Sequence, residues 1–181
     1  MVQPKPGQAL AVLGALAAAA VGAAFLLAPA PASARSGAQL STLESRVLEE
    51  INFIRTQHGL RPVRPSPELD EAALQHSQEM AADGYFEHRS ADGSAFWKRI
   101  ERYYPDDVPY WSVGENLLWS SPRIGASGAL QLWMRSPRHR ANILAARWRE
   151  VGVAAIHVGR APGAFRNLPV TIVTTDFGVR R

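Results

Sequence analysis

The sequence predicts an α+β fold in which helices pack on a small antiparallel sheet. The helical patterns come first, and two β-branched segments, at 151–158 and 168–178, come last. The segment "GRAPGAFRN" joins them, and its glycine and proline residues predict a hairpin with a long loop. Of the 181 residues, the 147 that follow position 34 are enough for one domain with a sizeable core.

Residues 1–34 are expected to be a signal peptide. Lys5 precedes an apolar, alanine-rich segment at 9–28, and "ASA" at 32–34 fits the small-x-small pattern of a cleavage site. An uncleaved membrane anchor is the alternative, because about 20 apolar residues can span a bilayer. In both cases the domain, residues 35–181 with a core at about 43–178, is expected outside the cytoplasm, secreted or periplasmic. Cleavage would leave no stable membrane span.

Composition excludes several functions. The chain has no cysteine, which rules out disulfides, thiolate zinc sites and cysteine nucleophiles. One of the 20 Lys and Arg residues, Lys5, falls within 1–34, which leaves 19 against 16 Asp and Glu. Because this excess is slight and scattered, no nucleic acid partner is expected.

Two helices are predicted near the start of the domain. At 41–58 apolar residues recur every three or four positions, Ser41 and Glu44 form a capping box, and Gly59 follows the end. A second helix begins at Ser66, continues through Pro67 and ends at 83–84.

The middle of the chain is less regular. A short helix is expected around Phe96, a loop at 105–112, a strand or helix entry at 113–119 and a helix at 123–135. The dipeptide at 136–137 repeats the start signal of the second helix.

The segment "WMRSPRHRANIL" at 133–144 has three interpretations: an anion-binding patch, the start of an ordinary helix, or one wall of a site that uses His139. In the first turn of a helix, between Arg138 and Arg140, a neutral imidazole is favoured. A neutral imidazole can serve as a metal ligand or a general base. A surface histidine without function is the alternative.

Two further segments carry candidate groups. His88 follows "DGYF", whose aromatic residues should enter the core, although an exposed loop histidine is the alternative. Glu115 lies in the apolar run "VGENLLW", where a carboxylate must be paired or functional. Asn116 could tie its own loop instead of contacting a ligand.

The remaining histidines and the tryptophans are interpreted as structural. His76 shares a helix face with Leu69, Ala73 and Met80, which predicts a core position. His58 ends a helix and His157 alternates along a strand. The five tryptophans are spread over several elements, which favours core packing over a sugar-binding platform.

Four segments of the chain form a pattern through their order and spacing. They are "GYFEH" at 84–88, "VGENLLW" at 113–119, "WMRSPRHRANIL" at 133–144 and "EVGVAAI" at 150–156. In these segments the chain resembles the CAP superfamily (cysteine-rich secretory proteins, antigen 5 and pathogenesis-related proteins, or SCP domains), and most closely its short, cysteine-free bacterial branch. The resemblance implies an α-β-α sandwich with a small antiparallel sheet between helical layers.

The resemblance also implies a cleft of two histidines and two glutamates that can hold zinc or another divalent cation. By motif, His88 and His139 match the histidines and Glu115 matches one glutamate, with Asn116 beside it. No carboxylate follows Trp133 where the second glutamate is expected. A metal, if held, is therefore expected to be weakly bound, and Arg138 and Arg140 are expected to tune His139 or to frame the cleft.

Three functions follow as hypotheses. The first is an exported binding module at the cell envelope, whose ligand is a small or extended molecule such as an envelope component. The second is a metal-dependent hydrolase acting on protein or peptidoglycan, with Glu115 as the candidate catalytic base. The third, lipid or sterol binding between helices, rests on the family alone. Whether the chain is an enzyme stays open at this point.

Overall fold

The computed structural model describes residues 41–181, so the predicted signal segment at 1–34 lies outside the described residues. The elements of this part follow one another along the chain as α1 (Thr42–Gln57), β1 (Arg64–Pro65), α2 (Pro67–Asp83), α3 (Phe96–Glu101), β2 (Trp111–Ser120), α4 (Ala126–Arg135), α5 (Pro137–Ile143), β3 (Glu150–Ala161), a 3-10 turn (Gly163–Phe165) and β4 (Leu168–Arg180). Helices precede the long hairpin, and the α+β prediction is confirmed.

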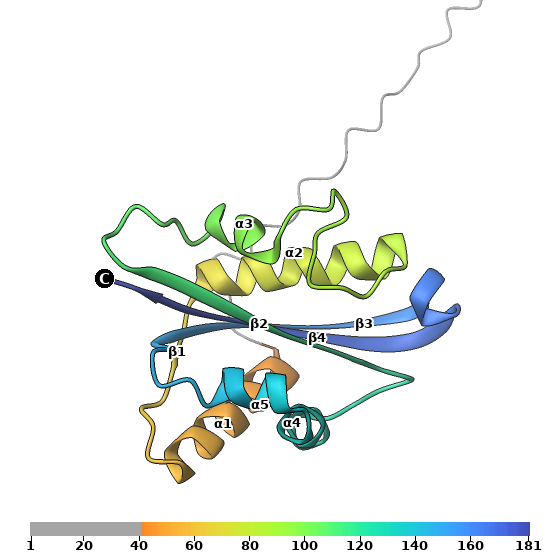
Figure 1. Cartoon of the computed structure of the whole chain (residues 1–181). Helices are drawn as coiled ribbons and strands as arrows, with labels where there is room; N and C mark the ends of the chain where they lie inside the picture. Colours follow the sequence, from red (N-terminus) through yellow and green to blue (C-terminus); the bar gives the residue numbers. More distant parts are fainter. Residues whose placement is uncertain (1–40) are drawn as a thin grey trace, which may run out of the picture. The chain divides into compact units, whose positions relative to one another are not determined.

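The sheet lies between two layers of helices. Figure 1 shows α2 and α3 on one face of the sheet and α1, α4 and α5 on the other. This arrangement confirms the predicted α-β-α sandwich. It agrees with the burial of consecutive residues along most of β4, because neighbouring residues of a strand point to opposite faces of the sheet.

The strand order is β1-β3-β4-β2. The β3–β4 and β4–β2 pairs are antiparallel, as expected, but the two-residue β1 pairs in parallel with β3. The sheet is therefore mixed, and β2 forms one edge. β1 was not predicted, because a pairing of two residues in a proline-rich connection has no local sequence pattern.

The first two helices begin and end where the capping signals predicted. Ser41 and Glu44 form the reciprocal capping box of α1, and the other carboxylate oxygen of Glu44 accepts a hydrogen bond from the Ala155 backbone at 3.0 Å. The Ser66 side chain caps α2. Gly84 ends it with φ of 72°, a left-handed conformation that glycine adopts without strain.

The core fills both interlayer spaces. Below the sheet in Figure 1, Val47 and Ile51 of α1 and Trp133 of α4 pack with Val151 and Phe177 of the sheet. Above it, α2 approaches β3 so closely that a Cβ on Gly152 would lie 2.0 Å from the Leu69 backbone. The close approach fixes α2, and therefore the loop that follows α2, relative to the sheet.

Several boundaries differ from the prediction. The strands predicted at 151–158 and 168–178 are longer, since β3 continues to Ala161 and β4 to Arg180. The helix expected at 123–135 begins at Ala126, after an N-cap at Gly125. The segment 113–119 is a strand, and β2 begins earlier than expected, at Trp111, inside the predicted loop 105–112. Pairing with β4 along the whole of β2 extends the strand beyond its apolar part.

Candidate functional site

The candidate site lies on the edge strand β2. Glu115 and Asn116 are neighbours, so their side chains point to opposite faces of the sheet. Glu115 contacts His76 and Arg99 of the α2–α3 layer, whereas Asn116 contacts residues of α5. Groups from both helical layers therefore meet at β2, which is an edge strand of the sheet formed by the described residues.

Both carboxylate oxygens of Glu115 are engaged. Oε1 lies 2.7 Å from Nδ1 of His88, and Oε2 accepts a hydrogen bond from the Arg99 guanidinium. Since a carboxylate only accepts, His88 carries its proton on Nδ1 in this pair, and its Nε2 keeps a free lone pair. The Glu115 side chain is 1% exposed and that of His88 is 52% exposed, so the buried acid orients an accessible imidazole.

Arg99 balances a buried acidic pair. Asp176 of β4 is opposite Glu115 in the antiparallel register and is fully buried. Burial, and then the charge of Glu115, raises the pKa of Asp176 well above its usual range. Burial also raises the pKa of Glu115 to about 7, although Arg99 acts in the opposite direction. Buried beside the Glu115 carboxylate, Asp176 therefore favours its neutral form at neutral pH.

His76 supports the site from beneath. Its Nε2 lies 2.9 Å from the Glu87 carbonyl and 4.0 Å from Oε2 of Glu115. Burial, and then Arg99, lowers the pKa of His76 to about 3, so the ring is neutral and donates from Nε2 to the carbonyl. Its predicted core position agrees with its complete burial. The hydrogen bond by which this core histidine holds the backbone next to His88 has no signal in the sequence.

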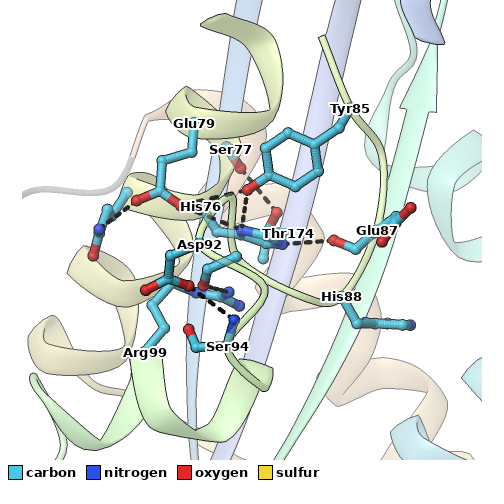
Figure 2. A network of polar contacts seen from close by, with 12 residues as sticks. His76, Ser77, Glu79, Tyr85, Glu87, His88, Asp92, Ser94, Arg99 and Thr174 are labelled. Carbon is cyan, nitrogen blue, oxygen red and sulfur yellow. Dashed lines mark hydrogen bonds and ion pairs between the residues drawn. The ribbon is translucent and has the colours of Figure 1, made fainter. Parts of the chain in front are cut away.

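The loop after α2 is fixed by its aromatic residues. Phe86 packs edge-on against Phe165, with ring centroids 6.3 Å apart, and Tyr85 lies beside His76. Figure 2 shows Tyr85, His76 and Glu79 gathered in one network, while the ring of His88 points away from it. The loop is therefore anchored on one side and presents His88 on the other.

On the opposite wall, α5 is tied to β2 by amide groups. The Asn116 side chain donates to the His139 carbonyl at 3.2 Å, and Asn142 donates to the Asn116 side-chain oxygen at 3.1 Å. A Cβ on Gly114 would lie 2.6 Å from Oδ1 of Asn142 and 2.8 Å from the Trp148 ring. The glycine therefore lets this wall approach the strand.

His139 is neutral for a reason that differs from the predicted one. The prediction rested on the helix start and on the flanking Arg138 and Arg140. In the structure, burial is the main cause that lowers the pKa of His139, and the charge of His88 is the second. Ser136 occupies the N-cap position of α5 but makes no capping hydrogen bond with its side chain.

These walls enclose a cleft of about 570 Å³. Its lining residues come from the loop after α2, from β2, from α5 and from the turn before β3: His88, Gly114, Glu115, Asn116, Ser136, Arg138, His139, Ala141, Asn142 and Arg147. Five of the six residues singled out from the sequence are thus brought together. Arg140 is the sixth, and it lines a neighbouring hollow with Met134 and Leu144 instead.

Three charged contributors to the site were missed. Asp176 lies in the apolar run "VTIVTTDFG", the same signal that singled out Glu115, and could have been found by it. Arg99 in "FWKRIE" and Arg147 in "AARWRE" lie beside other basic residues, and no local pattern distinguishes them from surface charges.

The chemistry of the donor set limits what metal the cleft could hold. Among residues 41–181 no group of three or more His, Asp, Glu or Cys side chains could hold a metal ion. His88 and His139 offer two imidazoles, one fewer than the usual protein ligands of a catalytic zinc site. These residues do not fit a tightly held ion, and a divalent cation here would depend on water for most of its ligands.

The fold and this cleft define the class of protein. A family model described as "CAP: Cysteine-rich secretory protein family" matches residues 48–173. The chain belongs to this family, although it contains no cysteine.

Two relatives come from Bacillus subtilis (strain 168). The uncharacterized protein YkwD is 28% identical over 120 residues, 66% of this chain and 45% of the relative. The uncharacterized membrane protein YlbC is 28% identical over 113 residues, 62% of this chain and 31% of the relative. The chain therefore matches less than half the length of these two curated relatives.

Solved structures share the fold. An extracellular protein containing an SCP domain from Bacillus anthracis matches with a TM-score of 0.59 and 25% identity, over 76% of this chain and 40% of that one. An outer surface protein from Borrelia burgdorferi matches with a TM-score of 0.60 and 17% identity, over 76% of this chain and 92% of that one.

None of the helices within residues 41–181 is both long and apolar enough to span a membrane.

Proposed function

We propose that this chain is an extracytoplasmic binding module whose cleft holds a ligand without cleaving it. The engagement of Glu115 carries the proposal. A general base must lie within hydrogen-bond reach of the proton that it removes. Glu115 instead accepts from His88 and from Arg99 and is almost fully buried, which suits an orienting role.

The surroundings of the two imidazoles support binding over nucleophilic catalysis. An imidazole oriented by a carboxylate can serve as a general base if a hydroxyl or a bound water lies against its free nitrogen. In the part of the chain that the structure describes, no hydroxyl is hydrogen-bonded to His88 or to His139. A hydrolase would therefore need its nucleophile, a water or a substrate hydroxyl, from outside this set.

A divalent cation enters this proposal only as an exchangeable occupant. His88 and His139 would be its protein ligands, and the cation would supply a Lewis acid when bound. Glu115 would orient His88 towards it through Nδ1, as outer carboxylates do for ligating histidines. With two protein ligands, we expect weak and reversible binding.

The support for export comes from the sequence before residue 41 and from a relative. The sequence at 9–34 has the pattern of a signal peptide, and the Bacillus anthracis relative is described as extracellular. We therefore propose that the ligand is met outside the cytoplasm, with components of the cell envelope as the first candidates.

The test of the proposal measures two quantities separately: the binding of the protein to a ligand and the cleavage of that ligand. Purified protein is incubated with isolated cell-wall material; the bound fraction is measured by co-sedimentation, and released products are measured by mass spectrometry. We expect retention that falls in the variant His139→Ala, and no new products with or without added zinc. Products that disappear on chelation and in His139→Ala would establish hydrolysis and overturn the proposal. His157→Ala, on β3 and outside the cleft, is the matched control.

A further inference from the structure

We propose that the cleft recognises an anionic group of its ligand, a carboxylate or a phosphate, through the guanidinium groups of Arg138 and Arg147. This inference rests on the proposed function, because it names the chemistry of what the binding cleft holds.

The charge of the lining is the first observation. Arg138 and Arg147 are the cationic side chains of the cleft, and both are exposed. Glu115 is the one acid among the described lining residues, and it is buried and paired with Arg99. A ligand in the cleft therefore meets two guanidinium groups and no accessible carboxylate, which favours an anion.

The availability of the two arginines is the second observation. Neither Arg138 nor Arg147 forms an ion pair within residues 41–181, whereas the exposed Arg102 and the half-buried Arg180 do. A guanidinium presents a planar fork of donors that matches carboxylate and phosphate oxygens. Both forks are thus free to bind a ligand.

The placement of Arg147 is the third observation. Its guanidinium lies over the Trp148 ring, 4.0 Å from the centroid. Trp148 is buried and donates from its indole nitrogen to the Asn142 carbonyl at 2.8 Å. Stacking on a fixed ring restricts the long side chain before a ligand arrives, and this lowers the entropic cost of binding.

His139 completes the arrangement. It lies one residue after Arg138 and lines the same cleft, and a neutral imidazole always carries one N–H donor. An anion in the cleft would therefore have a further donor on the same lining. An isolated cation would meet like charge at the same place, which agrees with the poor fit of the cleft to a tightly held metal.

The chain provides a matched control in Arg140. It is on the same helix, two residues from Arg138, and is equally charged and also exposed, but it lines the neighbouring hollow. An effect of net charge alone would be the same at both positions. An effect of the cleft would appear at Arg138 and not at Arg140.

The test is a titration of the full purified chain with inorganic phosphate and with succinate, followed by ¹H–¹⁵N correlation spectra at constant ionic strength, with choline chloride as the cationic probe. We expect saturable shifts at Asn116, His139 and Asn142 with at least one anion and none with choline. Arg138→Gln and Arg147→Gln should each weaken binding about tenfold, as expected for a lost charge-assisted hydrogen bond. Arg140→Gln should change it less than about twofold.

The two anions distinguish the possible sources of the anionic group on the ligand. A preference for phosphate indicates a phosphorylated ligand, and a preference for succinate indicates a ligand with a carboxylate. Absence of saturable shifts with both anions overturns the inference, as does an equal loss in Arg140→Gln. Arg147→Gln also removes the stacking on Trp148 and so could disturb that ring. Arg138→Gln leaves this stacking in place, so the test stays valid through that variant. Retention on cell-wall material without any anion response would refute this inference alone, whereas turnover would refute the proposed function.

Discussion

Glu115 of β2 and Asp176 of β4 are direct cross-strand partners, and both carboxyl groups are buried beside a single guanidinium, that of Arg99. Two acids with one neighbouring cation cannot both ionise without a large desolvation penalty in a dry interior. The pair therefore keeps a proton to a higher pH than exposed carboxyls do, and this has consequences for stability that can be measured.

Asp176→Asn should stabilise the protein at alkaline pH. A carboxyl group whose pKa is higher in the folded than in the unfolded protein stabilises the fold at low pH. This contribution is fully present below the pKa of the unfolded state, about 4, and is lost as the pH rises through the pKa of the folded state, which is about 7 for Glu115. The variant removes one buried acid. We expect its free energy of unfolding to exceed that of the wild type by about 1–3 kcal/mol at pH 8, with a smaller difference at pH 5.

Urea denaturation at both pH values measures this difference. Burial also raises the pKa of Asp70 to about 6. Because Asp70 is present in both proteins, its contribution to the pH dependence of stability cancels in the difference. A difference that is equal at pH 5 and pH 8, or larger at pH 5, would contradict the buried acidic pair.

Arg99→Met should destabilise the domain by about 3–5 kcal/mol, because it leaves buried acids without their counter-charge. Arg99 also donates to Ser90 in the loop that carries His88. Arg99→Lys, which keeps the charge but not the fork, should recover part of the loss. Chemical denaturation compares the three proteins, and an Arg99→Met variant as stable as the wild type would exclude Arg99 as the support of Glu115.

Gly114→Ala should destabilise the wall formed by α5. The added methyl group would meet Asn142 and the Trp148 ring at less than 3 Å, so one of them must move. We expect a loss of about 1–3 kcal/mol and reduced retention on the ligand, because Arg147 stacks on the displaced ring. Gly159→Ala, where a Cβ meets nothing within 4 Å, is the control and should stay within about 0.5 kcal/mol.

Zinc should bind weakly and depend on both imidazoles. With His88 and His139 as protein ligands, we expect a Kd above about 1 μM, well short of a structural zinc site. Calorimetric titration should show this binding reduced in His88→Ala and in His139→Ala. Stoichiometric zinc that stays with the protein through dialysis would show that the ligand set is larger than these two residues.

The sequence predicted those parts of the fold and site that have local signals. Ser41 and Ser66 marked helix starts through their caps, and the β-branched runs marked the hairpin. His88, Glu115 and His139 were found because motif spacing brought them together. Arg99 and Arg147 had no such signal, because their roles arise from burial beside Glu115 and from stacking on Trp148. Arg140 was assigned to the cleft with Arg138, but two positions apart on a helix they point in different directions.

The variant Glu115→Gln provides the most direct test of the central claim. According to this claim, Glu115 orients the His88 imidazole in a binding cleft and does not act as a general base. Glutamine keeps the shape and can still accept from Arg99. We predict that wild type and variant both release no product from cell-wall material or a peptide substrate, and that the variant loses less than about tenfold in retention. Measurable turnover by the wild type that falls by about 100-fold or more in Glu115→Gln would contradict the account, since that is the size of loss expected for a general base.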